Sequence, residues 1–161
     1  IADHEGPVYL RFGRPKVANF TPADQSFEIG KGILLQEGTD LTIVATGHLV
    51  WEALEAAKTL HSNGISAEVI NIHTIKPLDK DIILKSVGKT GAIVTAEEHN
   101  YLGGLGESVA RVLAENNPTP QEFIATQDTF GESGTPAQLM DKYGLNAAAI
   151  VKASEKVMQR K

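Results

Sequence analysis

The stretch of sequence that decides the fold spans residues 41–72 and is LTIVATGHLVWEALEAAKTLHSNGISAEVINI. Its first residues, 41–45, are almost continuously apolar, which is typical of a strand covered on both faces. Apolar residues then recur at helical spacing over 48–62, which predicts an amphipathic helix ended by the Asn-Gly pair at 63–64. A second strand is predicted at 67–72. This order indicates a βαβ unit with parallel strands.

The alternation of strands and helices continues toward the C-terminus. Pro77 and Asp79 mark a helix start, and a glycine-rich loop leads into a helix that begins near Leu105. We predict further strands at 92–96 and 122–126, and further helices at 136–142 and 146–158. Repeated units of this kind predict a mostly parallel sheet between layers of helices.

The N-terminal part of the chain is less regular. We predict a short strand at 8–12, a linker at 16–26, and at 27–36 either two short strands or one bent strand. The chain begins with Ile1 rather than Met, so we expect it to be cut from something longer. Residues before about Phe20 are expected to belong to a preceding domain.

Length and composition restrict the classes of function. The 161 residues suit one domain, and a net charge of −5 disfavours nucleic-acid binding. The absence of cysteine removes disulfides, thiol nucleophiles and thiolate metal sites. The longest purely apolar run, residues 147–151, is far too short to span a membrane. We therefore expect a soluble cytoplasmic domain with neither nucleic acid nor membrane as partner.

The loop after the strand at 92–96 is the richest candidate site, because open α/β sheets bind ligands beyond the carboxyl ends of their strands. Acids, a histidine and glycines follow one another there, and the free N–H groups of the next helix could hold an anion. Alternatively, the glycines permit a tight turn and close packing, while the polar side chains form a network or a subunit contact. The candidate residues are Glu97, Glu98, His99, Gly103, Gly104 and Gly106.

Other constellations give weaker signals. Glu98 and His99 are adjacent, so they point apart in an extended segment and do not form an acid/base pair without a bend. The five histidines lack metal-ligand spacing, and the sequence contains no serine-hydrolase elbow, Walker loop or dinucleotide fingerprint. Arg11 and Arg14 could bind a phosphate at a strand-to-turn junction, but from chemistry alone solvated arginines are favoured.

Four motifs together resemble the C-terminal portion of transketolase. They occur in order, with the family's spacing, and cover nearly the whole chain: GPVYLRFGRP (6–15), IHTIKPLD (72–79), EEHN with GGLGE (97–107), and SGTPAQLM with YGL (133–145). The resemblance implies a three-layer α/β/α domain with a five-stranded mixed sheet in which one strand is antiparallel. It also implies that residues 1–19 end a pyrimidine-binding domain and linker, and that residues 20–161 form the transketolase C-terminal domain.

The resemblance implies an activity for the parent enzyme, which would transfer a two-carbon ketol unit from a ketose phosphate to an aldose phosphate. Thiamine diphosphate and a divalent metal, Mg or Ca, would lie between two domains that this sequence lacks, so the fragment itself would bind neither and be inactive alone. Arg14 matches an arginine that contacts the substrate phosphate, although Phe12 and Gly13 replace the small hydroxyl residues often found beside it. We assign no catalytic residue to the fragment.

The expected partners are the remaining transketolase domains or an N-terminal subunit, sugar phosphates, and a second copy of the parent in a homodimer. Deoxyxylulose-phosphate synthase and the pyruvate dehydrogenase beta subunit share the central motifs and remain alternatives, although the closing motif is most similar to transketolase. A further alternative is a non-catalytic regulatory module that binds an anion.

Overall fold

The computed structural model describes residues 3–11, 13 and 16–161 and contains a five-stranded sheet in the order β1-β3-β2-β4-β5. The strands β2, β3, β4 and β5 pair in parallel, and β1 pairs antiparallel with β3. Their bounds are β1 Ile33–Gln36, β2 Leu41–Ala45, β3 Ala67–Asn71, β4 Ile93–Asn100 and β5 Gln121–Thr126. This topology confirms the predicted mixed sheet with one reversed strand.

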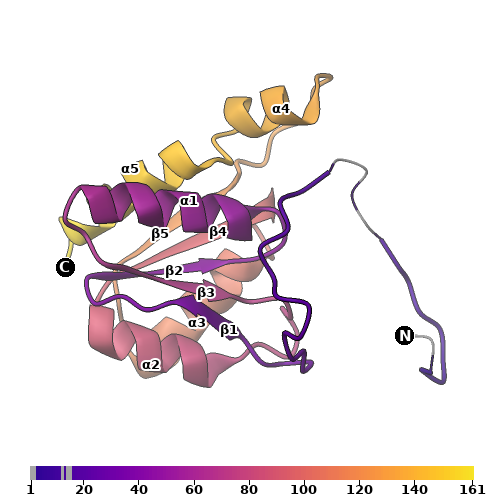
Figure 1. Ribbon diagram of the computed structural model, residues 1–161, viewed down its shortest axis with the longest axis horizontal. Coiled ribbons are helices and arrows are strands. Elements are labelled where there is room, and N and C mark those ends of the chain that lie inside the picture. The colour runs from indigo at the N-terminus through magenta and orange to yellow at the C-terminus, as the bar shows by residue number, and fades with distance from the viewer. Residues whose placement is uncertain (1–2, 12, 14–15) are drawn as a thin grey trace.

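Helices cover both faces of the sheet and complete the three layers (Figure 1). One face carries α1 (Leu49–Ser62) and α5 (Ala147–Met158), and the other carries α2 (Lys80–Thr90) and α3 (Leu105–Asn116). The short α4 (Pro136–Lys142) lies outside these layers, and none of its residues is buried.

The two sides of the sheet form two hydrophobic clusters that share β2 as their centre. All five β2 residues are buried; Ile43 packs in the cluster with α1 and α5, and Val44 packs in the cluster with α2 and α3. Burying such a side chain contributes about 1.5–3 kcal/mol, so a continuous apolar run is stable only between two layers. This burial is why residues 41–72 predict the fold.

Three local expectations differ from the structure. The segment 27–29 forms no strand, because the chain turns at Gly30, where φ is +86°, before β1 begins. Residues 8–11 form no strand either, and residue 12 lies outside the described residues. The strand predicted at 92–96 runs on to Asn100, because its end rejoins β5 through the pairing of Asn100 with Thr126.

Candidate functional site

The carboxyl ends of the parallel strands meet at one edge of the sheet, which we call the carboxyl edge. His48 follows β2, His73 lies just beyond β3, and the polar end of β4 lies between them and β5. At this edge the connection from β2 leads to β3 on one side and the connection from β4 leads to β5 on the other, and such a switch point is where open α/β sheets bind ligands. The candidate site is therefore built from these loops.

The side chain of Glu97, a residue of β4, caps the start of α3. Its buried carboxylate accepts hydrogen bonds from the Leu105 N–H at 2.7 Å and the Gly106 N–H at 2.8 Å. A Cβ atom on Gly104 would lie 2.1 Å from Glu97 Oε2, so only glycine admits the carboxylate there. The helix dipole favours this negative charge. The N–H groups predicted to be free for an anion thus have a partner within the chain, which favours the packing interpretation of these glycines.

The next two polar residues of β4 point to different partners. Glu98 Oε2 lies 2.8 Å from Nδ1 of His48, and the two side chains are 48% and 33% exposed. His99 Nδ1 instead lies 2.8 Å from the carbonyl oxygen of its neighbour Asn100. The sequence analysis placed residue 48 only as the first residue of the helix predicted over 48–62, and it missed the pairing of His48 with Glu98. Pairing of β2 with β4 brings the two residues together. The available signal in the sequence was that His48 comes shortly after one predicted strand and Glu98 shortly after another.

Gly103 completes the turn that leads into α3. It adopts φ +77°, a conformation that favours glycine, and its N–H donates a hydrogen bond to Glu107 Oε2 at 2.8 Å. The site residues drawn from the sequence therefore divide into two groups: Gly103, Gly104 and Gly106 shape the helix start, whereas Glu98 and His99 lie partly or largely exposed beside it.

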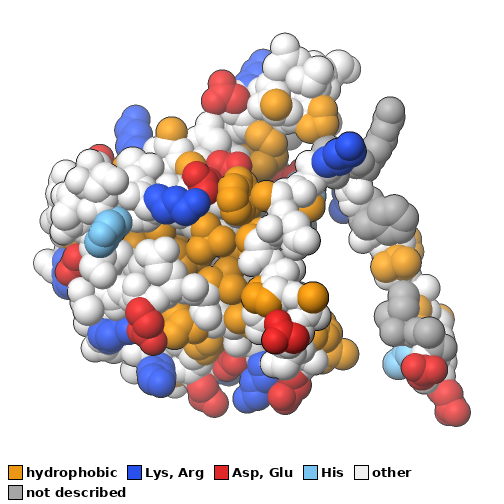
Figure 2. Space-filling view, viewed as in Figure 1, with side chains coloured by type: hydrophobic (Ala, Val, Ile, Leu, Met, Phe, Trp, Pro, Cys, Tyr) orange, Lys and Arg blue, Asp and Glu red, His pale blue; other side chains and the backbone are white. Residues whose placement is uncertain are grey.

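The segment 16–31, which we call the strap, crosses the carboxyl edge. Its Phe20 ring stacks on Trp51 of α1 with centroids 6.4 Å apart, and its Phe27 ring lies 4.4 Å from that of His73. A half-open hollow of about 370 Å³ separates the strap from the first turn of α1. Figure 2 shows hydrophobic side chains gathered along the hollow between the strap and the body of the domain. These contacts were not predicted from the sequence.

Exposed apolar side chains lie beside β4 and β5 at the same edge. Tyr101 and Leu102 follow β4, and the Phe130 side chain is 98% exposed. The loop is nevertheless ordered by hydrogen bonds, with Asn100 Nδ2 donating to Asp128 Oδ1 at 2.8 Å and the Tyr101 N–H donating to the Thr126 carbonyl at 3.0 Å. An ordered loop that presents apolar side chains is typical of a surface that contacts another protein or domain.

The donor set of the described residues does not suit a divalent metal with a diphosphate. Among residues 3–11, 13 and 16–161, no group of three or more His, Asp or Glu side chains could hold a metal ion. At the glycine-rich start of α3, the negative Glu97 carboxylate already accepts hydrogen bonds from the N–H groups there and would repel a bound diphosphate. Arg14, named from the resemblance, lies outside the described residues. None of the described helices is long and apolar enough to cross a membrane.

Comparisons with known proteins agree with the fold. The family model described as "Transketolase, C-terminal domain" matches residues 30–150. A 6-deoxy-6-sulfo-D-fructose transketolase subunit of Clostridium sp. (strain MSTE9) is 47% identical over 161 residues, which are 100% of this chain and 50% of that protein. A 1-deoxy-D-xylulose-5-phosphate synthase of Geobacter sulfurreducens is 40% identical over 98% of this chain and 25% of its own length.

A solved structure gives the same result in three dimensions. The structure described as a split-gene transketolase, inactive beta4 tetramer, matches with a TM-score of 0.86 and 46% sequence identity. The match covers 89% of this chain and 47% of that one. This chain thus spans about half the length of the transketolase subunits that it matches.

Proposed function

Because the chain belongs to the transketolase C-terminal domain family, we propose that it is the C-terminal domain of an enzyme that transfers a two-carbon ketol unit from a ketose phosphate to an aldose phosphate. The observation that supports this most is the 47% identity to a transketolase subunit across all 161 residues. The similarity to a deoxyxylulose-phosphate synthase, at 40% identity, keeps that thiamine-dependent enzyme as the second candidate.

We assign the domain a structural and positioning role. Thiamine diphosphate supplies the carbanion-stabilising chemistry of such enzymes. The described residues do not fit its diphosphate and metal, so we place the cofactor in the other domains of the parent enzyme. In this proposal Arg14 binds the substrate phosphate, because a guanidinium offers two parallel donors to phosphate oxygens. The boundary of the domain near residue 20 is supported by Phe20, which packs against the hydrophobic core.

The proposed partners are the preceding domains or a separate N-terminal subunit, and a second copy of the assembled enzyme. The exposed apolar side chains of Tyr101, Leu102 and Phe130 at the carboxyl edge support such a contact. The relatives that the chain matches include proteins described as subunits of a transketolase and of a split-gene transketolase. The isolated chain is expected to transfer no ketol unit.

The test compares the complete enzyme with the isolated chain. Ketol transfer from a ketose phosphate to an aldose phosphate is measured for both, and only the complete enzyme is expected to turn over. Arg14→Ala in the complete enzyme should raise KM for the phosphorylated acceptor about 10- to 100-fold, the loss of roughly 1.5–3 kcal/mol for a charged hydrogen bond. Glycolaldehyde, an acceptor without phosphate, serves as the control and should keep its KM. Turnover by the isolated chain would refute the proposal.

A further inference from the structure

The five-stranded sheet ends in β1 on one side and in β5 on the other, and these edge strands differ in regularity. β1 has four residues, and its register with β3 shifts between Leu34 and Gln36. β5 has six residues and keeps a regular parallel register with β4 from Gln121 to Ile124. An edge strand presents unpaired N–H and carbonyl groups, and a long, regular edge invites a second chain to pair with it. Of the two, β5 is therefore the edge that needs protection.

The register of β5 shows which of its backbone groups face outward. In a parallel ladder, alternate residues of a strand bond to the neighbouring strand, and the residues between them direct their N–H and carbonyl groups to the other side. The Ile93 N–H donates to the Pro120 carbonyl at 3.1 Å, and Ile93 pairs with Gln121. The even-numbered residues of β5 therefore bond to β4, whereas Gln121, Phe123 and Ala125 face the free edge.

Two side chains occupy outward carbonyl groups of this edge. Arg160 Nη1 donates to the Gln121 carbonyl at 3.0 Å, and Gln127 Nε2 donates to the Ala125 carbonyl, also at 3.0 Å. Both of these strand residues are buried, whereas Phe123 between them is 41% exposed. Among the described residues, the N–H and carbonyl of Phe123 have no hydrogen-bond partner. The free edge of β5 is thus covered at both ends and uncovered at its centre.

Arg160 is held in its place on the edge by a second contact. Its Nη1 also lies 2.6 Å from Glu122 Oε1, and Lys156 Nζ lies 2.8 Å from Glu122 Oε2. The exposed Lys152, one turn earlier in α5, lines the groove of about 300 Å³ between α5 and β5. Like charges that face each other destabilise strand pairing. A second copy that paired at this edge would bring its own set of these cations.

β5 of a second copy is complementary to this edge, because a strand can pair antiparallel with itself about a two-fold axis. In that arrangement Phe123 lies opposite Phe123 of the second copy, and Gln121 lies opposite Ala125. Hydrogen-bonded pairs of this kind exchange both N–H···O bonds, so the dimer needs all three carbonyls as acceptors. In the structure, Arg160 and Gln127 already occupy two of the three.

We propose that the side chains of Arg160 and Gln127 cap the free edge of β5 and prevent two copies of the chain from pairing through it. The surface that they cover is a strand-pairing surface, centred on Phe123, whose partner is β5 of a second copy. The capping does not depend on the proposed function, because it involves only backbone groups of β5 and the side chains that cover them.

The test compares the 161-residue chain with Arg160→Ala/Gln127→Ala, which lacks both caps. Sedimentation velocity over a range of concentrations should show that this double variant dimerises about tenfold or more strongly than the unaltered chain, because the freed carbonyls accept new hydrogen bonds. Gln127→Ala alone, which removes no charge, should have an intermediate effect. Arg111→Ala/Gln159→Ala removes the same residue types from exposed positions outside β5 and should sediment like the unaltered chain.

Phe123→Pro identifies the surface through which the double variant associates. Proline lacks an N–H group, and at an outward-facing position it removes no bond to β4. Added to the double variant, Phe123→Pro should abolish the gained association, whereas Phe123→Ala, which keeps the N–H, should retain most of it. Hydrogen exchange is a second readout. The Phe123 amide should exchange quickly in the unaltered chain and be protected in the dimer of the double variant.

Three outcomes would overturn the capping role. The double variant could sediment like the unaltered chain, so that the caps restrain no pairing. It could associate equally well when it carries Phe123→Pro, so that the contact lies on another surface. The Phe123 amide could already be protected in the unaltered chain, so that the edge is not free. If circular dichroism shows that the double variant is unfolded, Gln127→Ala decides alone, and unchanged association of that variant overturns the proposal.

Discussion

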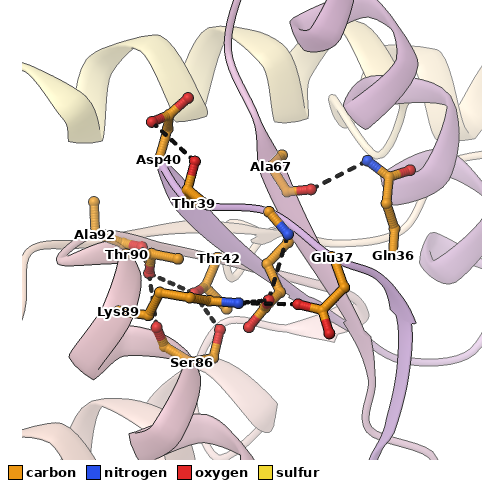
Figure 3. A network of polar contacts seen from close by, with 12 residues as sticks. Gln36, Glu37, Thr39, Asp40, Thr42, Ala67, Ser86, Lys89, Thr90 and Ala92 are labelled. Carbon is orange, nitrogen blue, oxygen red and sulfur yellow. Dashed lines mark hydrogen bonds and ion pairs between the residues drawn. The ribbon is translucent and has the colours of Figure 1, made fainter.

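The two edges of the sheet differ in how their polar groups are satisfied. At the amino edge, where the parallel strands begin, buried polar groups bond to one another (Figure 3). Thr42 Oγ1 lies 2.6 Å from Ser86 Oγ and 2.7 Å from Thr90 Oγ1, and all three side chains are buried. The buried Glu68 carboxylate pairs with Lys89, which also bonds Glu37 at 3.1 Å. The buried polar groups of the amino edge are therefore satisfied by other side chains of the same domain.

At the carboxyl edge, more side chains are exposed and fewer polar groups are satisfied within the domain. The His48–Glu98 pair there is substantially exposed, the apolar rings of Phe27 and Phe130 face solvent, and Nε2 of His73 is buried with no hydrogen-bond partner among the described residues. One unsatisfied imidazole nitrogen and several exposed apolar side chains therefore gather at this edge. The comparison shows that the amino edge satisfies its buried polar groups within the domain, whereas the carboxyl edge exposes apolar side chains beside one buried cap, Glu97.

Gly38→Ala should have the largest effect and tests how rigid the amino edge is. A Cβ atom at Gly38 would lie 2.2 Å from the backbone of Ala67 and Glu68, which cannot move without displacing the start of β3. We expect a loss of about 4 kcal/mol or more, enough to prevent folding in many small domains. Urea unfolding followed by circular dichroism measures it.

Gly88→Ala is the matched control for this substitution. Gly88 is exposed in α2 with open space around it, so alanine should stabilise the helix by about 0.5–1 kcal/mol. If Gly38→Ala were as stable as the unaltered chain, the backbone at the start of β3 would have to move without cost. That result would contradict a rigid amino edge.

Glu97→Ala sharpens the comparison, because it distinguishes a buried structural carboxylate from the exposed carboxylate beside it at the carboxyl edge. The substitution leaves the buried N–H groups of Leu105 and Gly106 without their acceptor, and we expect a loss of about 3 kcal/mol. Glu98→Ala, one residue along β4, removes only a partly exposed pair and should cost less than about 1 kcal/mol. Equal thermal midpoints for the two variants would contradict the capping role of Glu97.

The sheet could be predicted from the sequence because its signals are local. The apolar run at 41–45 has no stable alternative to burial on both faces, and the helical spacing after it fixes the crossover. The end of β4 was missed because its residues, 97–100, are polar, and their strand conformation depends on pairing with Thr126 far along the chain. Polar sequence at a strand end resembles a loop until its partner is known.

The candidate site was predicted less completely, for a related reason. The motif of acids and glycines at 97–106 marked the right edge of the sheet, but which acid folds back onto the helix start depends on the alternation of side chains along β4. The contacts of Phe20 with Trp51 and of Phe27 with His73 depend on the path of an irregular segment, which periodicity does not predict.

The smallest expected effect concerns the ion pair at the amino edge and its dependence on pH. Burial by itself raises the pKa of Glu68, but hydrogen bonds from Lys89, Ser86 and the Gly38 N–H outweigh it and hold the pKa below its ordinary value of 4.5. A carboxyl group with a lowered pKa in the folded state stabilises the fold above the ordinary value and loses that contribution as the pH falls below it. The unaltered chain should therefore lose stability as the pH decreases from 4.5.

Lys89→Met tests this by removing the ammonium that holds Glu68 ionised. At pH 7 the variant should lose about 1–2 kcal/mol, since the exposed part of the Lys89 side chain is screened by water. The difference from the unaltered chain should narrow below pH 4.5, because a protonated Glu68 no longer needs a cation. Lys85→Met, an exposed lysine on the same helix, is the control and should show little change at either pH. If Lys89→Met lost the same amount of stability at every pH from 7 to 3, the loss would come from the packing of the lysine stem. The charge of Lys89 would then not stabilise the amino edge.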